Sequence, residues 1–325
     1  MSAMFEIKNL TLNFDTPGGM VHALDKVSLS VQRGECVALV GESGSGKSIT
    51  GMSVMRLNGA SARVTVDRIA LDGIDLMALS DKAFRKVRGK RIAMIFQNAK
   101  SSLNPLRRVG DTLTDILCAH AEPKISRKQA RGKVLETLIQ IGIDQAEDRM
   151  EAYPAELSGG MCQRIMIAAA LVCEPEMIIA DEPTSALDVT TQIKVMNLLM
   201  SACRDRGVAV IFISHDLALA SAYCDRLVVM HAGQVLEDGP AETVFAAPAH
   251  PYTRMLLDTI PYGKDDVSTL KPMGGSLPDL RRMELPRCRF SERCPRSADI
   301  CVSQPLPKVE AGDKHLVRCH FPNER

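Results

Sequence analysis

The glycine-rich stretch Gly41-Glu42-Ser43-Gly44-Ser45-Gly46-Lys47-Ser48 lies between the apolar run Cys36 to Val40 and a segment with helical periodicity. This order predicts a strand, a tight loop and a helix, which is the context that a phosphate-binding loop requires. Backbone N–H groups of such a loop can surround phosphate oxygens at the N-terminus of the helix. We expect Lys47 to reach the β- and γ-phosphates and the Ser48 hydroxyl to ligate Mg²⁺. The residues of the predicted nucleotide site are Gly41, Ser43, Gly44, Gly46, Lys47 and Ser48.

Further apolar runs predict the buried strands of a parallel sheet. They are Ile92 to Phe96, Met177 to Ala180, Val208 to Ile213 and Leu227 to Met230. Helical patterns cover roughly Lys47 to Leu57, Gln129 to Ile141, Gly160 to Val172 and Gln192 to Arg206. The first forty residues alternate apolar and polar side chains, which favours antiparallel strands in front of this core. The expected fold class is α/β with a mixed sheet core and an antiparallel β-subdomain.

Composition narrows the classes of function. Lys+Arg is 40 and Asp+Glu is 39, so the net charge of +1 gives no global reason to expect a nucleic-acid partner. The first residues, Met1 to Glu6, lack the basic and apolar regions of a signal peptide. No apolar stretch reaches the roughly 18 residues of a spanning helix. We therefore predict a protein that stays inside the cell and serves any membrane process from the membrane surface.

Two other motifs place polar groups where ligands bind. Asp181 and Glu182 follow an apolar strand, and ligands of open α/β sheets bind at the carboxyl ends of strands. We expect Asp181 to hold the Mg²⁺ shell and Glu182 to orient and polarise the attacking water. Leu157-Ser158-Gly159-Gly160 precedes a long predicted helix whose N-terminus suits an anion, although an ordinary serine N-cap explains this stretch better when it is taken alone.

Six motifs in order carry a resemblance to a known family. They are the phosphate loop, Gln97 after its strand, Leu157-Ser158-Gly159-Gly160, Asp181-Glu182, Ser185-Ala186-Leu187-Asp188, and His215 after its strand. Over about residues 4 to 260 the chain resembles the nucleotide-binding domain of ATP-binding cassette (ABC) transporters. The resemblance implies a phosphate-loop ATPase with a helical subdomain at about residues 98–175. It also implies two such domains stacked head to tail, with ATP between them.

The resemblance assigns catalytic roles to three residues. Glu182 would act as the catalytic base, and His215 would contact the γ-phosphate. Gln97 would sense Mg²⁺ and the attacking water and link them to the transmembrane partner.

The resemblance also assigns residues to ATP binding. The residues implied to close on the partner's ATP or to line the dimer interface are Ser158, Gly159, Gly160 and Asp188. Phe14 occupies the position of an aromatic residue that stacks on adenine, with packing in the core as the alternative.

A narrower resemblance rests on Glu42 in the loop, on Ser102-Leu103-Asn104-Pro105 and on His250-Pro251-Tyr252-Thr253-Arg254. These features resemble the ATPases of the oligopeptide, dipeptide and nickel uptake group. This implies a peripheral subunit at the cytoplasmic face of the inner (plasma) membrane that powers uptake of peptides. Its implied partners are permease subunits, a second ATPase subunit (the same chain or a related one) and an extracytoplasmic solute-binding protein. The alternatives are uptake of nickel or another small solute, and, less expected, a soluble ABC ATPase in translation or repair.

Composition changes after Ile260 to Pro, Gly, Arg and Cys. We therefore predict a boundary near residues 261 to 275, with a cassette at 1–260 and a small irregular appendage at 261–325. Between Arg281 and Arg296, six arginines face two glutamates. A solvated basic face is the expected explanation, with a contact to lipid, a partner subunit or a negatively charged metal cluster as alternatives.

Four cysteines of the appendage form a separate candidate site. Five residues separate Cys288 from Cys294, six separate Cys294 from Cys301, and seventeen separate Cys301 from Cys319. Four thiolates can cross-link such a segment by holding Zn²⁺ or an iron–sulfur cluster, but this spacing lacks the close pairs of most zinc ribbons. The resemblance to the peptide-transporter ATPases implies a [4Fe-4S] cluster, with zinc second and free thiols last.

Overall fold

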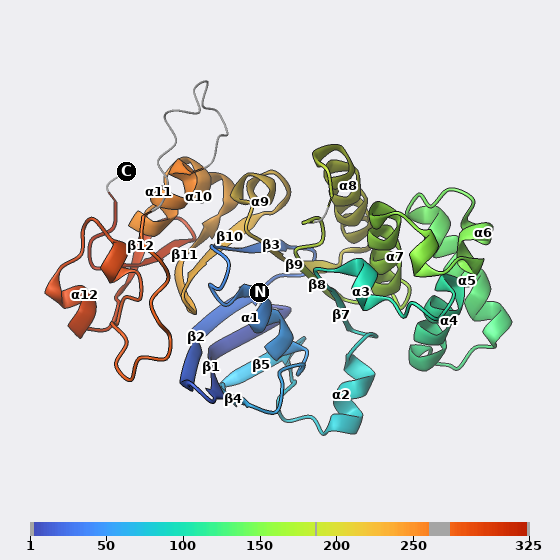
Figure 1. Ribbon diagram of the computed structural model, residues 1–325, viewed down its shortest axis with the longest axis horizontal. Coiled ribbons are helices and arrows are strands. Elements are labelled where there is room, and N and C mark those ends of the chain that lie inside the picture. Colours follow the sequence, from blue (N-terminus) through green and yellow to red (C-terminus); the bar gives the residue numbers. More distant parts are fainter. Residues whose placement is uncertain (1–2, 186, 260–273, 324–325) are drawn as a thin grey trace. The chain divides into compact units, whose positions relative to one another are not determined.

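Figure 1 shows a computed structural model of the chain, which describes residues 3–185, 187–259 and 274–323. The chain forms two compact units. The first comprises Met1–Gln32, Cys36–Met77 and Phe212–Arg325, and the second comprises Arg33–Glu35 and Ala78–Ile211. The boundary predicted near residues 261 to 275 lies almost wholly outside the described residues.

The first unit begins with an antiparallel sheet. Its alternating sequence places Phe5 and Ile7 in the interior, while Lys8 is exposed. Residue Phe5 pairs with Val31 across the first two strands. The strand order is β2-β1-β5-β6, and β4 also pairs with β1. The bounds are β1 (Phe5–Thr16), β2 (Gly19–Val31), β4 (Ala62–Thr65), β5 (Arg68–Leu71) and β6 (Ile74–Asp75).

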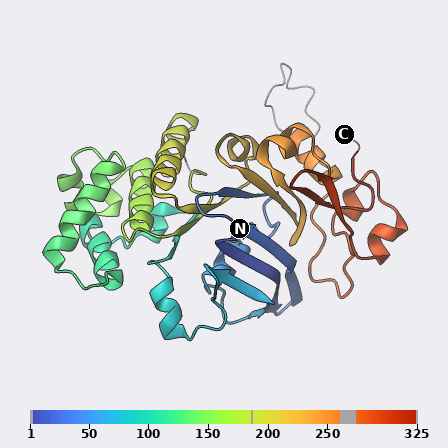
Figure 2. The same ribbon diagram turned by 180° about the vertical axis from the view of Figure 1, so that it is seen from behind.

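A second group of strands in this unit carries the phosphate loop. All five residues of β3 (Cys36–Val40) are buried, as expected of a strand covered on both faces. It pairs in parallel with β10 (Arg226–His231), which pairs antiparallel with β11 (Gln234–Pro240). In both ribbon views the helices α9 and α10 lie on one side of these strands, and the β1–β2 sheet lies on the other (Figures 1 and 2). The helices of this part are α1 (Lys47–Val54), α9 (Leu217–Tyr223), α10 (Ala241–Ala246) and α11 (Pro251–Asp258).

The C-terminal segment is more regular than the sequence predicted. It contains the 3₁₀ turn η3 (Ser291–Arg293), the helix α12 (Asp299–Ser303) and the hairpin of β12 (Lys308–Gly312) and β13 (His315–Arg318). Strand β13 pairs antiparallel with β11, so the hairpin extends the sheet of the first unit. The hairpin was missed because its apolar alternation is short and its turn contains no strong turn dipeptide.

The second unit is mainly helical around two parallel strands. Strand β7 (Ile92–Ile95) pairs in parallel with β8 (Met177–Asp181), and every residue of both is buried. Strand β9 (Ala209–Ser214) then carries the chain into the first unit. The helices are α2 (Asp81–Val87), α3 (Ala99–Ser102), α4 (Val109–His120), α5 (Arg127–Gln140), α6 (Ala146–Glu151), η1 (Pro154–Glu156), α7 (Gly159–Leu171) and α8 (Val189–Arg206).

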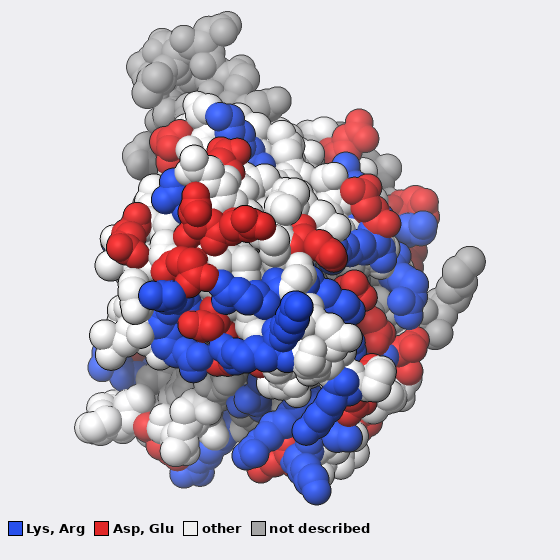
Figure 3. Space-filling model, turned by 90° about the vertical axis from the view of Figure 1, so that its right-hand side faces the viewer, with Lys and Arg blue, Asp and Glu red and all other residues white. Residues whose placement is uncertain are grey.

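Ion pairs connect helices α4, α5 and α6. Arg127 reaches Asp111 at 2.9 Å, and Arg131 pairs with Glu151. The face of the molecule in Figure 3 accordingly shows basic and acidic side chains intermingled. These pairs are exposed and screened by water, so each contributes little to stability.

The predicted α/β class is confirmed, since the predicted buried strands occur and the strongly periodic segments form helices. The 12-residue helix α4 was not predicted, since Gly110, Thr112 and Thr114 in its first half are weak helix formers. The short helices α2, α3, α6, α9, α10, α11 and α12 were also not predicted, because they offer too few turns for a periodic pattern. Within the described ranges, no helix is long and apolar enough to span a bilayer.

Candidate nucleotide-binding site

The predicted phosphate loop connects β3 to α1 and depends on glycine at two positions. Gly41 has φ +148°, and a Cβ atom there would lie 2.1 Å from the Met230 carbonyl oxygen. Gly46 has φ +103°, and its Cβ would lie 2.7 Å from a methyl group of Leu24. A side chain at Gly41 would force the loop away from the backbone of β10, so the close approach of loop and strand requires glycine there; at Gly46 the positive φ is the main reason for glycine.

Lys47 lies across this loop. Its side chain is buried, and its ammonium group donates hydrogen bonds to the carbonyl oxygens of Gly41 (2.8 Å) and Glu42 (2.9 Å). The Ser45 hydroxyl lies 3.3 Å from the same nitrogen. The loop's own carbonyl groups therefore hold a cation beside exposed backbone at Ser43 and Gly44, an arrangement suited to a phosphate group.

The structure brings together Gln97 and Glu182 in the second unit. The Gln97 side-chain amide donates a 2.7 Å hydrogen bond to Glu182 Oε2. Glu182 follows Asp181, which is 3% exposed at the end of β8, and has an unusual φ of +45°. A non-glycine residue in this region costs roughly 1–3 kcal/mol and is often found at functional sites. The contact fixes a carboxylate at a strand end, where it could accept a proton from water.

The predicted signature residues lie at two adjacent helix N-termini of the same unit. The Ser158 hydroxyl caps α7 by accepting from the Met161 N–H at 3.3 Å, and Asp188 caps α8 by accepting from the Thr191 N–H at 3.0 Å. The hydrogen bonds at Thr191 lower the pKa of Asp188. A Cβ on Gly160 would lie 3.1 Å from the Thr191 methyl group, so the two helix ends are close. Ser158 and Gly159 remain exposed.

The remaining predicted ATP-site residues belong to the first unit. His215 is exposed directly after β9, and Phe14 is half-buried in β1 beside Val21 and Ala62. The partial exposure of Phe14 is compatible with stacking on a ligand. The first unit thus contains Phe14, the phosphate loop and His215, and the second contains the other predicted residues.

Sequence reasoning missed the surroundings of Glu42. Arg293 donates to both carboxylate oxygens of Glu42, at 2.7 and 2.9 Å, and the Tyr252 hydroxyl accepts from the Glu42 N–H at 3.0 Å. Interactions with His231 and Arg293 lower the pKa of Glu42 to about 2. We assign the larger part to Arg293, because the His231 Nδ1 atom is 3.6 Å from the carboxylate, beyond hydrogen-bonding range, and burial lowers the pKa of His231.

This finding corrects the expectation of a solvated basic face. Arg289 is 6% exposed and donates to the carbonyl oxygens of His22 (2.8 Å) and Ala232 (2.6 Å). The Arg293 side chain is also 6% exposed. Only the other arginines of the segment are compatible with a solvated role. The sequence analysis had noted Glu42 in the loop and Tyr252 in the later motif His250 to Arg254. Nothing in the sequence indicated that these two residues contact each other.

The four late cysteines gather in one small region. Three of them are buried, and none forms a disulfide. The Cys288 N–H donates to the Cys301 carbonyl oxygen at 2.9 Å. Burial raises the pKa of Cys288 to about 12 and that of Cys319 to about 11, and neighbouring thiols of the set add to both effects. Across the described residues, however, no group of three or more His, Cys, Asp or Glu side chains is placed to hold a metal ion.

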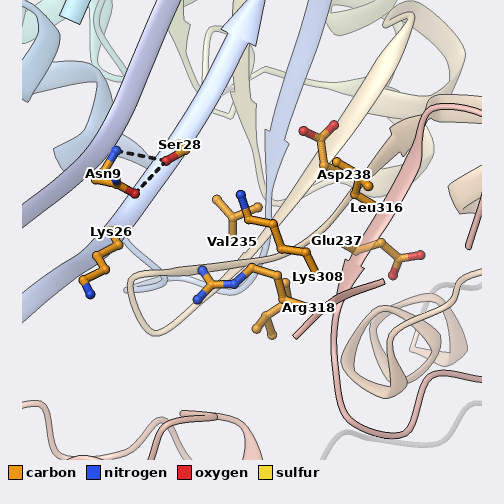
Figure 4. Close-up of a pocket in the computed structure, with 10 residues that line it drawn as sticks. Asn9, Lys26, Ser28, Val235, Glu237, Asp238, Lys308, Leu316 and Arg318 are labelled. Carbon is orange, nitrogen blue, oxygen red and sulfur yellow. Dashed lines mark hydrogen bonds between the residues drawn. The ribbon is translucent and has the colours of Figure 1, made fainter. Parts of the chain in front are cut away.

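A pocket of about 260 Å³ lies in the first unit (Figure 4). Lys26, Lys308 and Arg318 line it. Its two carboxylates already have partners: Glu237 bonds His315 at 2.7 Å, and Asp238 binds Arg226. The pocket contains none of the residues predicted to bind ATP.

Residues 24–185 match the ABC transporter family, and residues 236–301 match the family described as oligopeptide/dipeptide transporter, C-terminal region. The dipeptide transport ATP-binding protein DppD of Bacillus subtilis is 42% identical over 100% of this chain and 96% of its own length. The chain belongs to the ABC transporter family. It is an ATPase that binds ATP and Mg²⁺ and couples ATP hydrolysis to transport.

Other relatives of this ABC ATPase support the same family assignment. The probable D,D-dipeptide transport ATP-binding protein DdpD of Escherichia coli is 44% identical over 99% of the chain and 97% of its own length. Among solved structures, the dimeric ATP-binding cassette MJ0796 with ADP and Pi has a TM-score of 0.66 and 30% identity. That alignment covers 73% of this chain and 99% of the cassette. CbiO1 from Clostridium perfringens, part of an ABC transporter complex, has a TM-score of 0.63 and 28% identity, covering 76% of this chain and 92% of its own.

Proposed function

We propose that this ABC ATPase powers the uptake of dipeptides or oligopeptides through a separate transmembrane permease. One observation carries the proposal: similarity to peptide-transport ATP-binding proteins extends over the whole chain and includes the C-terminal region as well as the cassette. The proposed partners are permease subunits and an extracytoplasmic solute-binding protein. The proposed location is the cytoplasmic face of the inner membrane, where the chain would be a peripheral subunit.

The ATP site of this proposal is formed by two chains. The phosphate loop and Lys47 of one subunit would bind the phosphates, with Ser48 and Asp181 on Mg²⁺. Ser158, Gly159 and Gly160 of a second subunit, identical or related, would approach the same nucleotide from the exposed start of α7. This geometry is supported by the exposure of that helix end and by the dimeric cassettes to which the chain is similar.

We propose that Glu182 is the general base of hydrolysis. Its carboxylate would accept the proton of the attacking water. The 2.7 Å hydrogen bond from Gln97 holds this carboxylate in place, and Gln97 would also contact the Mg²⁺ shell. His215 would donate to the γ-phosphate, and Phe14 would stack on adenine. Asp188 would fix the start of α8 at the dimer interface through its cap to Thr191.

The transport assignment is tested by reconstitution. The chain is co-expressed with the permease and binding protein from neighbouring genes and placed in proteoliposomes with internal ATP. We expect labelled di- or tripeptides, but not Ni²⁺, to accumulate and to stimulate ATP hydrolysis, with a Glu182→Gln complex as the inactive control. Accumulation of Ni²⁺ without peptide uptake would replace the proposed substrate class. ATP hydrolysis that is stimulated by ribosomes or DNA and needs no permease would instead identify the chain as a soluble ABC ATPase of translation or repair.

We further propose that Cys288, Cys294, Cys301 and Cys319 hold a [4Fe-4S] cluster, with Zn²⁺ as the alternative. The donor chemistry is suitable, because four free thiols lie close enough for their charges to interact. The present arrangement does not place three of them around one point, so the thiols would have to move to bind a metal. When bound, such a group would cross-link the C-terminal segment.

Metal content tests this site directly. Anaerobically purified wild type is compared with Cys294→Ser and with Cys118→Ser, whose cysteine lies outside the set. Iron and sulfide in near-equal amounts, lost only in Cys294→Ser, are the expected result. Zinc lost in the same variant would favour the alternative, and absence of all three elements from wild type would leave the cysteines as free thiols.

A further inference from the structure

The phosphate loop is attached to the C-terminal segment through the side chain of Glu42. The two terminal nitrogens of Arg293 donate to the two oxygens of Glu42, at 2.7 and 2.9 Å, which is the two-pronged geometry of a strong arginine–carboxylate pair. The arginine side chain is 6% exposed and the glutamate side chain 30% exposed. The pair is therefore sheltered from water, unlike the surface pairs of α4 to α6.

Arg293 is held in position from its own side as well. Its Nε donates to the Gly274 carbonyl oxygen at 3.0 Å, and its guanidinium carbon lies 5.9 Å from the centre of the Phe290 ring. Phe290 is fully buried, with the Tyr252 ring centre at 5.1 Å. A planar guanidinium fixed by packing loses little further freedom when it binds a carboxylate. The C-terminal segment thus presents a rigid cation to the loop.

The hold on Glu42 extends to the lysine of the loop. Tyr252 fixes the Glu42 N–H at 3.0 Å, while the Glu42 carbonyl oxygen accepts a hydrogen bond from the Lys47 ammonium at 2.9 Å. The carbonyl that supports Lys47 therefore belongs to the residue that Arg293 and Tyr252 hold. In addition, Arg293 neutralises a carboxylate that sits in a loop built to receive negatively charged phosphates.

We propose that Arg293 is a positioning residue for ATP binding: it fixes the phosphate loop through Glu42 and cancels the charge of that carboxylate. This inference rests on the proposed assignment of Gly41 to Ser48 as the ATP-phosphate site. It makes the C-terminal segment part of the machinery that binds nucleotide, although no atom of Arg293 needs to touch ATP.

The two effects of Arg293 predict how the affinity for MgATP changes in three variants. Arg293→Ala leaves Glu42 unpaired and charged beside the phosphates, so we expect the Kd for MgATP to rise about tenfold. Glu42→Gln removes the charge but retains an acceptor, and we expect a change of no more than about threefold. The double variant Glu42→Gln/Arg293→Ala should bind ATP more tightly than Arg293→Ala alone, because the unpaired charge is gone. A purely structural contact would give no such recovery.

The experiment measures MgATP affinity by calorimetry on the full chain, together with the melting temperature of each variant. Arg282→Ala is the matched control, because Arg282 belongs to the same segment but pairs with Glu292 in an exposed position. We expect wild-type affinity for this control. Lys47→Ala tests the underlying site separately: if it binds ATP normally, the proposed phosphate site is wrong, whatever Arg293 does.

Two results would overturn the positioning role while Lys47→Ala abolishes binding. One is an Arg293→Ala affinity within twofold of wild type, and the other is a double variant that binds no better than Arg293→Ala. If Arg293→Ala does not fold, Arg293→Lys decides. Lysine at this position retains the charge and loses the two-pronged contact. An affinity for MgATP that is reduced, by up to severalfold, supports the positioning role, and an affinity equal to that of wild type refutes it.

Discussion

Substitution of Gly41 by alanine tests the geometry on which the ATP site depends. The new Cβ would lie 2.1 Å from the Met230 carbonyl oxygen, far inside van der Waals contact. Met230 is held in β10 by its pairing with β11, and the loop is held by a 3.1 Å hydrogen bond from the Ser45 N–H to the Glu42 carbonyl oxygen. The loop or strand β10 must therefore shift, which costs about 1–3 kcal/mol by analogy with overpacked cores. Alanine at a φ of +148° adds about 1–3 kcal/mol.

The two costs together amount to about 2–6 kcal/mol, against a typical domain stability of about 5–15 kcal/mol. We expect Gly41→Ala to lower the free energy of unfolding of the first unit by this amount and to abolish detectable ATP binding. Urea denaturation followed by circular dichroism measures the first effect, and calorimetry with MgATP measures the second.

Gly59→Ala provides the matched control in the same unit. Gly59 has no atom within 4 Å of its would-be Cβ and does not require a positive φ. Its substitution should change stability by no more than about 0.5 kcal/mol. If Gly41→Ala were as stable as Gly59→Ala and bound ATP, the loop would not have the close approach to β10 on which this reasoning rests.

Two further predictions concern chemistry and pH. Glu182→Gln should reduce ATP hydrolysis by about 10²–10⁴-fold, the usual contribution of a general base, while MgATP affinity stays near wild type; equal loss of both would contradict the role of base. Burial lowers the pKa of His250 from 6.5 to about 3, so the folded state favours the neutral ring. Its contribution to stability is present above pH 6.5 and is lost as the pH falls toward 3. His250→Asn keeps a side-chain acceptor for the Tyr252 N–H, so its stability should vary less with pH over that window, as measured by urea denaturation at stepped pH. Parallel pH curves for the two proteins would refute this assignment.

The sequence was informative where chemistry and local structure coincide. The glycines around Lys47 and the buried run before them specify strand, loop and helix within a few residues, and the structure has all three. Ser158 likewise predicts a helix start from its own side chain, which caps α7. Such features depend on neighbours in the chain, so a single sequence is enough to find them.

The rest depended on contacts between distant residues. Arg293 is 251 positions from Glu42, and nothing beside it distinguishes it from the exposed Arg282. What separates them is the packing of Phe290 and Tyr252, which is determined only when the chain has folded. The choice between a solvated and a buried arginine could therefore not be made from local charge.

The C-terminal segment combines three kinds of attachment to the cassette unit that bears the phosphate loop. Strand β13 pairs with β11, Arg289 donates to carbonyl oxygens of distant segments, and Arg293 donates to the carboxylate of Glu42. An arginine that is buried without a partner would be strongly destabilising. Arg289 and Arg293 therefore need the loop and strands that they bind, and they stabilise those elements in return. The dependence is mutual, and it helps a region that is poor in apolar residues to adopt a defined fold: its two buried arginines find their partners in the ATPase core.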